Sequence, residues 1–141
     1  MPKALAFGTF DGFHPGHRFY LDEAAKRGDL TVLVARDATV AKVKGRPPRR
    51  NEQERLAAVK AAGFKAVLGS ETDRYAILSE ARPDVICLGY DQQAFTGGLE
   101  AACKERGLAA EIVRLPAFRP DIYKSSIIDS HENSDRLNES R

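Results

Sequence analysis

The arrangement of apolar runs along the chain constrains the fold more than any other feature. Several of these runs are continuously apolar rather than alternating, which is typical of strands that are covered on both faces of a sheet. Five such runs lie at residues 4–8, 30–35, 66–69, 84–89 and 111–116. Because stretches with helical character separate them, the sequence predicts βαβ units with right-handed crossovers. We therefore expect an α/β, Rossmann-like fold with three layers and a five-stranded parallel sheet.

Three stretches between the runs carry signals of helices. Residues 16–27 end in two basic residues, and a glycine follows them, which suits a helix C-terminus. Asn51 and Glu54 have the spacing of an N-cap residue and its partner in a capping box, and Gly63 supplies the stop. Around 94–106 the apolar residues fall on one face. Each stretch is expected to cross over between two parallel strands.

The length and composition indicate one soluble domain. The chain has 141 residues, of which 43% are hydrophobic and 30% are charged. We expect one folded domain over residues 1–128, followed by a polar, disordered tail over 129–141. The sequence shows no apolar run long enough for a membrane span and no signal-peptide pattern. We therefore expect a cytoplasmic protein that does not bind membranes.

The charge balance and the cysteines argue against a nucleic-acid-binding protein, a disulfide-rich protein and a zinc protein. With 22 basic and 20 acidic side chains the net charge is only +2, so nucleic acid is not an expected partner. Cys87 and Cys103 form neither a disulfide framework nor a zinc spacing. We expect both to be buried small hydrophobic residues.

Short segments rich in glycine or polar residues follow the predicted strands, at the edge where open parallel sheets bind ligands. The first of them, GTFDGFHPGH at 8–17, contains His14 and His17 around Pro15 and Gly16. Glycine lets a ligand approach the backbone, proline fits a first helical turn, and helix N-termini attract anions. We therefore expect the two histidines to donate to phosphate oxygens. The segment is neither a Rossmann fingerprint nor a P-loop, and it lacks further zinc ligands.

The segment at 35–50 contributes a basic cluster. Its six basic residues are Arg36, Lys42, Lys44, Arg46, Arg49 and Arg50. We read most of it as a solvated basic loop, with Lys44 placed to bring an ammonium group to the same phosphates. Carboxylates near strand ends are candidates to hold Mg²⁺ through water, and the sequence leaves open which of them do so. These are Asp11, Asp37, Asp73 and Asp91.

These motifs resemble the nucleotidyltransferase superfamily that includes the cytidylyltransferases. GTFDGFHPGH carries its HxGH element, NEQERLAAV resembles its second element, and KSSII occupies the place of the third. Longer stretches, above all RPDVICLGYDQ, are similar to archaeal-type FAD synthases over about residues 3–128. The resemblance implies an FMN adenylyltransferase. Such an enzyme moves AMP from ATP to the phosphate of FMN, giving FAD and pyrophosphate, with Mg²⁺ or another divalent cation.

The resemblance also implies roles for individual residues. The catalytic residues would be His14 and His17 on the phosphates, Lys44 on the nucleotide or acceptor phosphate, and Arg55 near the triphosphate and base. The nucleotide-binding residues would be Thr9, Phe10 and Gly16 in the first loop, Gly89, Tyr90 and Asp91 at the base and ribose, and Ser125 and Ser126 at the β- and γ-phosphates.

Two alternatives stay open at this point. One is a cytidylyltransferase that uses the same site for CTP and a phospho-alcohol such as glycerol 3-phosphate, although GYDQ at 89–92 favours adenine and FMN. The other is a non-catalytic nucleotide- or flavin-binding module, because Asp129 stands where relatives have a basic residue. Lys124 is a candidate to replace that charge. Relatives are often homodimers, so the resemblance allows a homodimer, but no residue specifies its interface.

Overall fold

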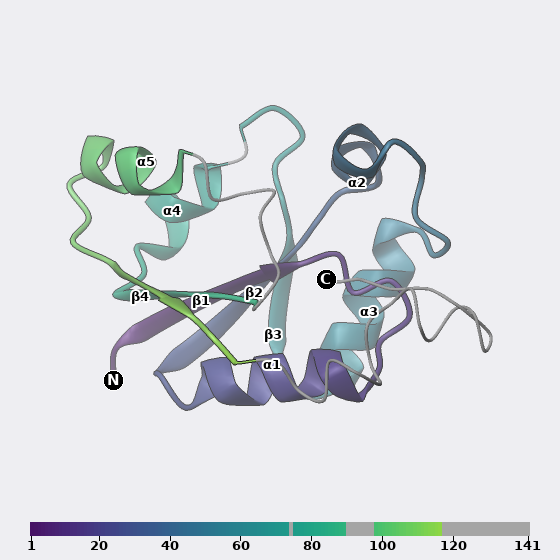
Figure 1. Ribbon diagram of the computed structural model, residues 1–141, viewed down its shortest axis with the longest axis horizontal. Coiled ribbons are helices and arrows are strands. Elements are labelled where there is room, and N and C mark those ends of the chain that lie inside the picture. Colours follow the sequence, from purple (N-terminus) through teal and green to yellow (C-terminus); the bar gives the residue numbers. More distant parts are fainter. Residues whose placement is uncertain (74, 90–97, 117–141) are drawn as a thin grey trace.

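The computed structural model describes residues 1–73, 75–89 and 98–116. Its strands are β1 (Lys3–Gly8), β2 (Asp29–Val34), β3 (Lys65–Leu68), β4 (Val85–Leu88) and β5 (Glu111–Arg114). They pair in parallel in the order β3-β2-β1-β4-β5 (Figure 1). Each strand coincides with one predicted apolar run to within one or two residues. The prediction of an α/β, Rossmann-like fold with a five-stranded parallel sheet is therefore confirmed.

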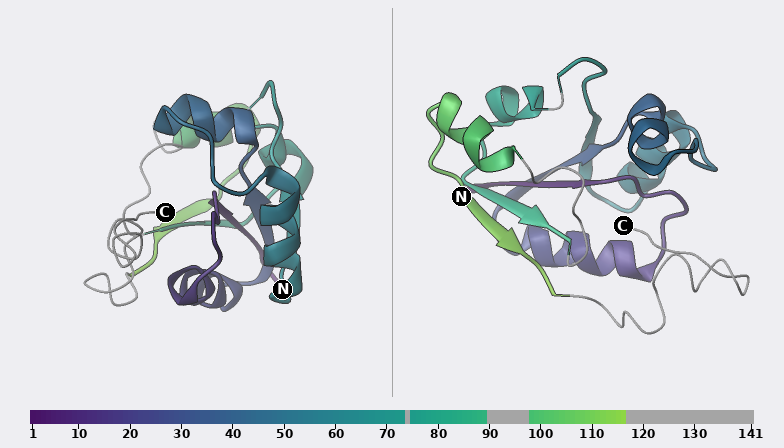
Figure 2. Two further views of the ribbon diagram at one scale, coloured as in Figure 1. Left: turned by 90° about the vertical axis from the view of Figure 1, so that its right-hand side faces the viewer. Right: turned by 45° about the horizontal axis from the view of Figure 1, so that its top comes forward.

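Five helices are present in the described part of the chain, and they lie on both faces of the sheet. They are α1 (Pro15–Ala25), α2 (Asp37–Lys44), α3 (Glu52–Ala61), α4 (Ala76–Ala81) and α5 (Leu99–Glu105). Alternate residues of β1 enter two separate cores. Ala4 and Ala6 pack with residues of α1 and α3, whereas Leu5 and Phe7 pack with residues of α4 and α5. Figure 2 shows α1 on one side of the sheet and α4 and α5 on the other, which confirms the three layers.

The three stretches with helix signals in the sequence contain α1, α3 and α5, and the first two of these helices begin with a side-chain cap. Asn51 and Glu54 form the expected capping box, in which each side chain accepts a hydrogen bond from the other residue's backbone amide, at 2.8 and 3.0 Å. Pro15 is the first residue of α1, as the sequence predicted. In α5 the expected apolar face, which includes Cys103, is buried.

The prediction was wrong for residues 37–44, which were read as part of a basic loop. They form α2, which ends at Gly45 in the left-handed conformation (φ 79°). Val40 is the one residue of α2 that is buried, so the sequence carries almost no helical periodicity there. The six-residue α4 also had no predicted counterpart, and it begins without a side-chain cap. A single buried position in α2 and the short length of α4 explain both omissions.

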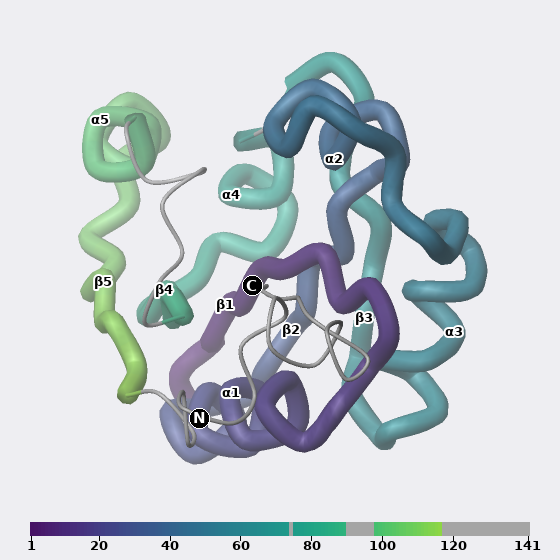
Figure 3. Tube along the Cα trace, turned by 45° about the vertical axis from the view of Figure 1, so that its right-hand side comes forward, coloured from purple at the N-terminus to yellow at the C-terminus, as the bar shows by residue number. Residues whose placement is uncertain are grey.

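The strand order reverses between β1 and β4. From β1 the chain moves outward through β2 to β3, and it then returns to the other side of β1 with β4 and β5. In open α/β sheets, ligands bind outside the carboxyl ends of the strands at this switch point. The loop after β1 passes beside α3 at this end of the sheet (Figure 3). The same end therefore receives most of the residues that the sequence singled out.

Two expectations concern the rest of the chain. Among the helices of the described residues, none is long and apolar enough to cross a bilayer. The expected tail at 129–141, and with it the boundary at residue 128, lies outside the described residues.

Candidate functional site

The loop that follows β1 is shaped by one aromatic side chain. Phe10 has a positive φ of 56°, which is uncommon for a bulky residue and is typical of functional loops. This turn folds the Phe10 ring back over Gly8, where a Cβ atom would lie only 2.6 Å from the ring's Cζ atom. The ring is 2% exposed and meets the His17 ring edge-on at 5.3 Å between centroids. A residue without a side chain is therefore required at Gly8, because any Cβ atom there would displace the Phe10 ring from its contact with His17.

His14 and His17 form a capping box at the N-terminus of α1. His14 is the N-cap residue, and its Nδ1 atom accepts a hydrogen bond from the Gly16 amide at 3.0 Å. His17 stands at N3, and its Nδ1 atom accepts from the His14 amide at 3.3 Å. A ring nitrogen that accepts an amide proton carries none itself, so the neutral rings bear their protons on Nε2. The capping box thus assigns Nε2–H as the donor of each ring.

The two imidazoles are held as a pair. Their centroids lie 3.8 Å apart with an interplanar angle of 21°, so the rings are stacked. His17 is 8% exposed and also contacts Phe13, at 5.7 Å between centroids. The first turn of α1 contains no acidic residue, so the positive end of the helix dipole is not neutralised there. Two fixed donors at a helix N-terminus suit an anion such as phosphate.

Asp11 ties the histidine loop to the basic segment. Its two carboxylate oxygens accept hydrogen bonds from the backbone amides of Arg49 and Arg50, at 2.8 and 2.9 Å. This contact brings the segment that follows α2 against the loop that follows β1. Lys44, the last residue of α2, is exposed and lies upstream on the same segment. The structure therefore holds the end of the basic segment against the histidine loop, through an aspartate that the sequence suggested for a metal. The contact expected of Lys44 with the phosphates stays a prediction.

Arg55 is the fully buried centre of this end of the sheet. Its side chain is 0% exposed, and its guanidinium donates to the carbonyls of Arg50, Thr9 and Ala35 at 2.8–2.9 Å. It also forms an ion pair with Asp37, at 2.7 Å between Nη2 and Oδ1. These acceptors belong to the loops after β1 and β2 and to the segment before α3. The contacts of Arg55 therefore hold three segments together, whereas a contact with the nucleotide stays a prediction.

The other predicted residues fall into two groups. Thr9, Phe10 and Gly16 lie in the histidine loop and first turn, where Thr9 accepts from Arg55 and Phe10 faces the core. Gly89 follows β4, and its carbonyl accepts from the Arg114 guanidinium at 2.7 Å. Four predicted site residues lie outside the described residues: Tyr90, Asp91, Ser125 and Ser126.

Tyr20 has a role at this end of the sheet that no motif in the sequence indicated. Its hydroxyl lies between β1 and β4, 2.7 Å from the Cys87 carbonyl and 3.2 Å from the Phe7 amide. Burial raises the pKa of the Tyr20 hydroxyl well above its usual range, so it remains a donor. Its position one turn after His17 on α1 was the only signal that could have indicated it.

The structure also bears on metal and cysteine chemistry. Across the described residues, no group of three His, Cys, Asp or Glu side chains could hold a metal ion. Of the four candidate carboxylates, Asp11, Asp37 and Asp73 are engaged by backbone amides or arginines, and Asp91 lies outside the described residues.

Cys87 and Cys103 are buried and free, as expected. Burial raises the pKa of Cys87 to about 11, so this thiol is inert at neutral pH.

Stacked histidines at a helix N-terminus, beside the switch point of a Rossmann-like sheet, fit the class of proteins that bind nucleotide phosphates. A family model described as cytidylyltransferase-like matches residues 5–130. The match covers most of the chain, which therefore belongs to the cytidylyltransferase-like family. The resemblance inferred from the HxGH element is thereby confirmed.

Curated relatives of this chain carry a more specific name. The FAD synthase of Methanosarcina barkeri (strain Fusaro / DSM 804) is 48% identical over 120 residues, which cover 82% of this chain and 84% of that protein. The FAD synthase of Aciduliprofundum boonei (strain DSM 19572 / T469) is 40% identical over 120 residues, covering 84% and 80%. The expected similarity to archaeal-type FAD synthases is confirmed by these relatives.

Solved structures agree with the fold. A lipopolysaccharide core biosynthesis protein from Thermoplasma volcanium GSS1 superposes with a TM-score of 0.76 at 39% identity, covering 84% of this chain and 98% of that one. A pantoate-beta-alanine ligase from Francisella tularensis superposes with a TM-score of 0.57 at 11% identity, covering 93% and 69%. At that identity the ligase supports the fold alone.

Proposed function

We propose that this protein is an FMN adenylyltransferase, an FAD synthase, which moves AMP from ATP to the phosphate of FMN. The observation that carries the proposal is the stacked His14–His17 pair, whose Nε2–H donors stand at a helix N-terminus beside the switch point. The naming of relatives at 40–48% identity supports FMN and ATP as the substrates.

The proposed reaction is one in-line displacement. A phosphate oxygen of FMN attacks the α-phosphorus of ATP, a new P–O bond forms, and the bond to the bridging oxygen of pyrophosphate breaks. The attacking group is already an anion, so the protein needs no strong general base. Catalysis then rests on positioning and on stabilising negative charge on the phosphate oxygens. His14 and His17 would supply that stabilisation through Nε2–H.

The remaining predicted residues take supporting roles in this proposal. Lys44 would bring a positive charge to the nucleotide or acceptor phosphate from the end of α2. Arg55 would act through the loops it holds, because its guanidinium is buried among protein acceptors. Residues proposed to bind the nucleotide through backbone or hydroxyl groups are Thr9, Phe10, Gly16, Gly89, Tyr90, Asp91, Ser125 and Ser126.

We also propose that Mg²⁺ or another divalent cation accompanies the triphosphate. The described residues do not form a ligand cage of their own. Mg²⁺ is often held by substrate phosphates, water and only one or two carboxylates, so it would enter with the nucleotide. No step of the mechanism above is assigned to it.

A variant of His14 separates catalysis from folding. His14→Asn keeps an N-cap residue of the most favoured type, so we expect an unfolding free energy within about 0.5 kcal/mol of wild type. It removes one imidazole donor, which by analogy with oxyanion-hole donors lowers kcat by about a hundred- to a thousandfold. His14→Ala is the matched control, because it loses the cap as well and should cost about 1 kcal/mol of stability. Wild-type turnover by His14→Asn would refute the role given to the histidines.

The substrates are tested by pyrophosphate release from ATP and from CTP, each with Mg²⁺, against FMN and glycerol 3-phosphate. Release with ATP and FMN alone is the expected result. Release with CTP and glycerol 3-phosphate would keep the site and replace the substrates. Nucleotide binding without release in any combination would favour the non-catalytic module. The homodimer and the cytoplasmic location stay predictions on which the comparisons do not bear.

A further inference from the structure

The contact between Tyr20 and the strands β1 and β4 has no counterpart in the mechanism above. The β1–β4 ladder runs from Ala4 and Val85 to Ala6 and Cys87, where the pairing ends. In a parallel ladder, the next backbone amide donates to a carbonyl of the neighbouring strand. Here the Phe7 amide donates to the Tyr20 hydroxyl at 3.2 Å, and the hydroxyl lies 2.7 Å from the Cys87 carbonyl. A side-chain oxygen therefore occupies the position of the next rung.

The hydroxyl has one proton, and its surroundings decide where that proton goes. It lies 2.7 Å from the Cys87 carbonyl and 3.2 Å from the Phe7 carbonyl, so the shorter bond takes the proton. The hydroxyl thus accepts from β1 and donates to β4. Both partners are backbone groups of buried residues, which makes the bridge costly to break without a replacement. The bridge therefore links the ends of the two strands through one side-chain oxygen.

The location of this bridge gives it a consequence for binding. β1 and β4 are the neighbours between which the strand order reverses. In Figure 2 (right) their arrows diverge toward the carboxyl ends. Gly8 and Thr9 follow Phe7 into the histidine loop, while Leu88 and Gly89 follow Cys87. The distance between β1 and β4 at Tyr20 therefore affects where the next residues of both strands lie, and these residues are proposed to bind the nucleotide.

We infer that the Tyr20 hydroxyl acts as a spacer that holds β1 and β4 apart at the switch point and so sets the opening that admits the nucleotide. This inference rests on the proposed function only for the identity of the nucleotide. Tyr20 is a positioning residue, because it acts through the backbone of β1 and β4. Without the hydroxyl, the Phe7 amide and the Cys87 carbonyl would pair directly, and the two loops would move toward each other.

The test uses Tyr20→Phe, which removes one oxygen atom and keeps the ring. The first measurement is the Kd of α,β-methylene-ATP by calorimetry, and the second is the KM for ATP and for FMN with the full chain. We expect Kd and the KM for ATP to rise about tenfold, with kcat and the KM for FMN within about twofold of wild type. Val59→Ala is the control, because Val59 is buried near the C-terminus of α3 and its truncation perturbs the same core away from the switch point.

The outcomes separate this inference from the proposed function. Tyr20→Phe that binds the analogue as tightly as wild type would overturn the spacer role, even if wild type makes FAD. Wild type that binds the analogue but makes no FAD would overturn the proposed function, while a weaker Kd of Tyr20→Phe would still support the spacer. An equal weakening in Val59→Ala would also overturn the spacer, because general loosening would then explain it. If Tyr20→Phe is less stable than wild type, Kd is compared at a lower temperature at which circular dichroism shows wild type, Tyr20→Phe and Val59→Ala to be equally folded.

Discussion

Replacement of Arg55 by lysine tests how this end of the sheet is held together. Arg55 is 0% exposed, and its guanidinium donates to three backbone carbonyls and to Asp37. The planar fork of arginine reaches acceptors in several directions at once, whereas lysine offers one nitrogen. Arg55→Lys keeps the positive charge and can retain one or two of these bonds. The variant therefore isolates the contribution of the fork from that of the charge.

The magnitude follows from the bonds that are lost. A hydrogen bond from a charged donor contributes about 1.5–3 kcal/mol, and a buried carbonyl left without a partner adds its desolvation cost. With two carbonyls deprived of their donor, we expect a loss of about 3 kcal/mol. For a domain of this size that corresponds to a fall in Tm of roughly 6–12 °C. Asp37→Asn should cost less, about 1 kcal/mol, because the Asp37 side chain is 41% exposed and water can replace the ion pair.

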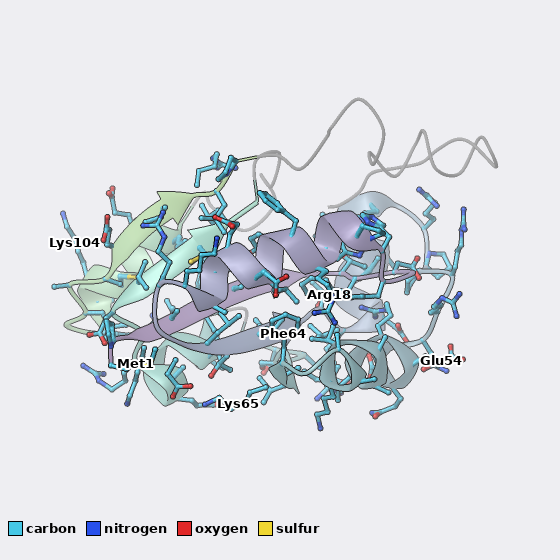
Figure 4. All side chains as sticks on the ribbon, turned by 90° about the horizontal axis from the view of Figure 1, so that it is seen from below. Met1, Arg18, Glu54, Phe64, Lys65 and Lys104 are labelled. Carbon is cyan, nitrogen blue, oxygen red and sulfur yellow. The ribbon has the colours of Figure 1, made fainter. Side chains whose placement is uncertain are left out.

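The assay is urea unfolding followed by circular dichroism, with Arg18→Lys as the matched control. Arg18 is an exposed arginine that donates to the Ala62 carbonyl at 3.0 Å and lies over the Phe64 ring (Figure 4), so its substitution should cost below about 1 kcal/mol. A loss below about 1 kcal/mol in Arg55→Lys would refute the bonding account. If that stable variant also lost turnover a hundredfold, Arg55 would have to contact the nucleotide directly.

Two further changes have definite expected outcomes. Gly8→Ala places a Cβ atom 2.6 Å from the Phe10 ring, so we expect the free energy of unfolding to fall by about 1–3 kcal/mol and turnover to be reduced. Urea unfolding and FAD formation measure the two effects, and wild-type values would show that Phe10 can move aside. Burial raises the pKa of Cys87 to about 11, so the unfolded chain releases the thiol proton first and the free energy of unfolding should fall as the pH rises from about 9 to about 11. In Cys87→Ala that part of the decline should be absent, and an unchanged pH profile would contradict the burial argument.

The strands and the capped helices could be predicted from the sequence because each carries a local signal. Strands buried on both faces need continuous apolar runs, and a capping box such as Asn51 with Glu54 is visible as a spacing of three residues. The position of the histidine pair could be predicted as well, because a parallel sheet collects its loops at one edge. In contrast, α2 buries only Val40, so no periodicity in the sequence could have indicated it.

The roles of the buried polar residues could not be predicted, because their partners are backbone atoms far away in the sequence. Tyr20 bonds to Cys87 across 67 positions, and Arg55 bonds to Thr9 across 46. A backbone carbonyl looks the same at every residue, so neither pairing leaves a trace in the sequence. The resemblance named Arg55 for the nucleotide, but its structural contacts required the folded chain.

One principle connects the polar side chains at this end of the sheet: each binds backbone. The histidines accept from amides in the first turn of α1, Asp11 accepts from amides of the basic segment, Arg55 donates to three carbonyls, and Tyr20 bridges two strands. Side chains that bind backbone fix the path of a loop whatever the neighbouring side chains are. The residues that would meet the phosphates can therefore stay rigid while the loop sequences around them vary. Substitutions that preserve hydrogen-bond geometry, such as His14→Asn, should then spare the fold and reveal the chemistry alone.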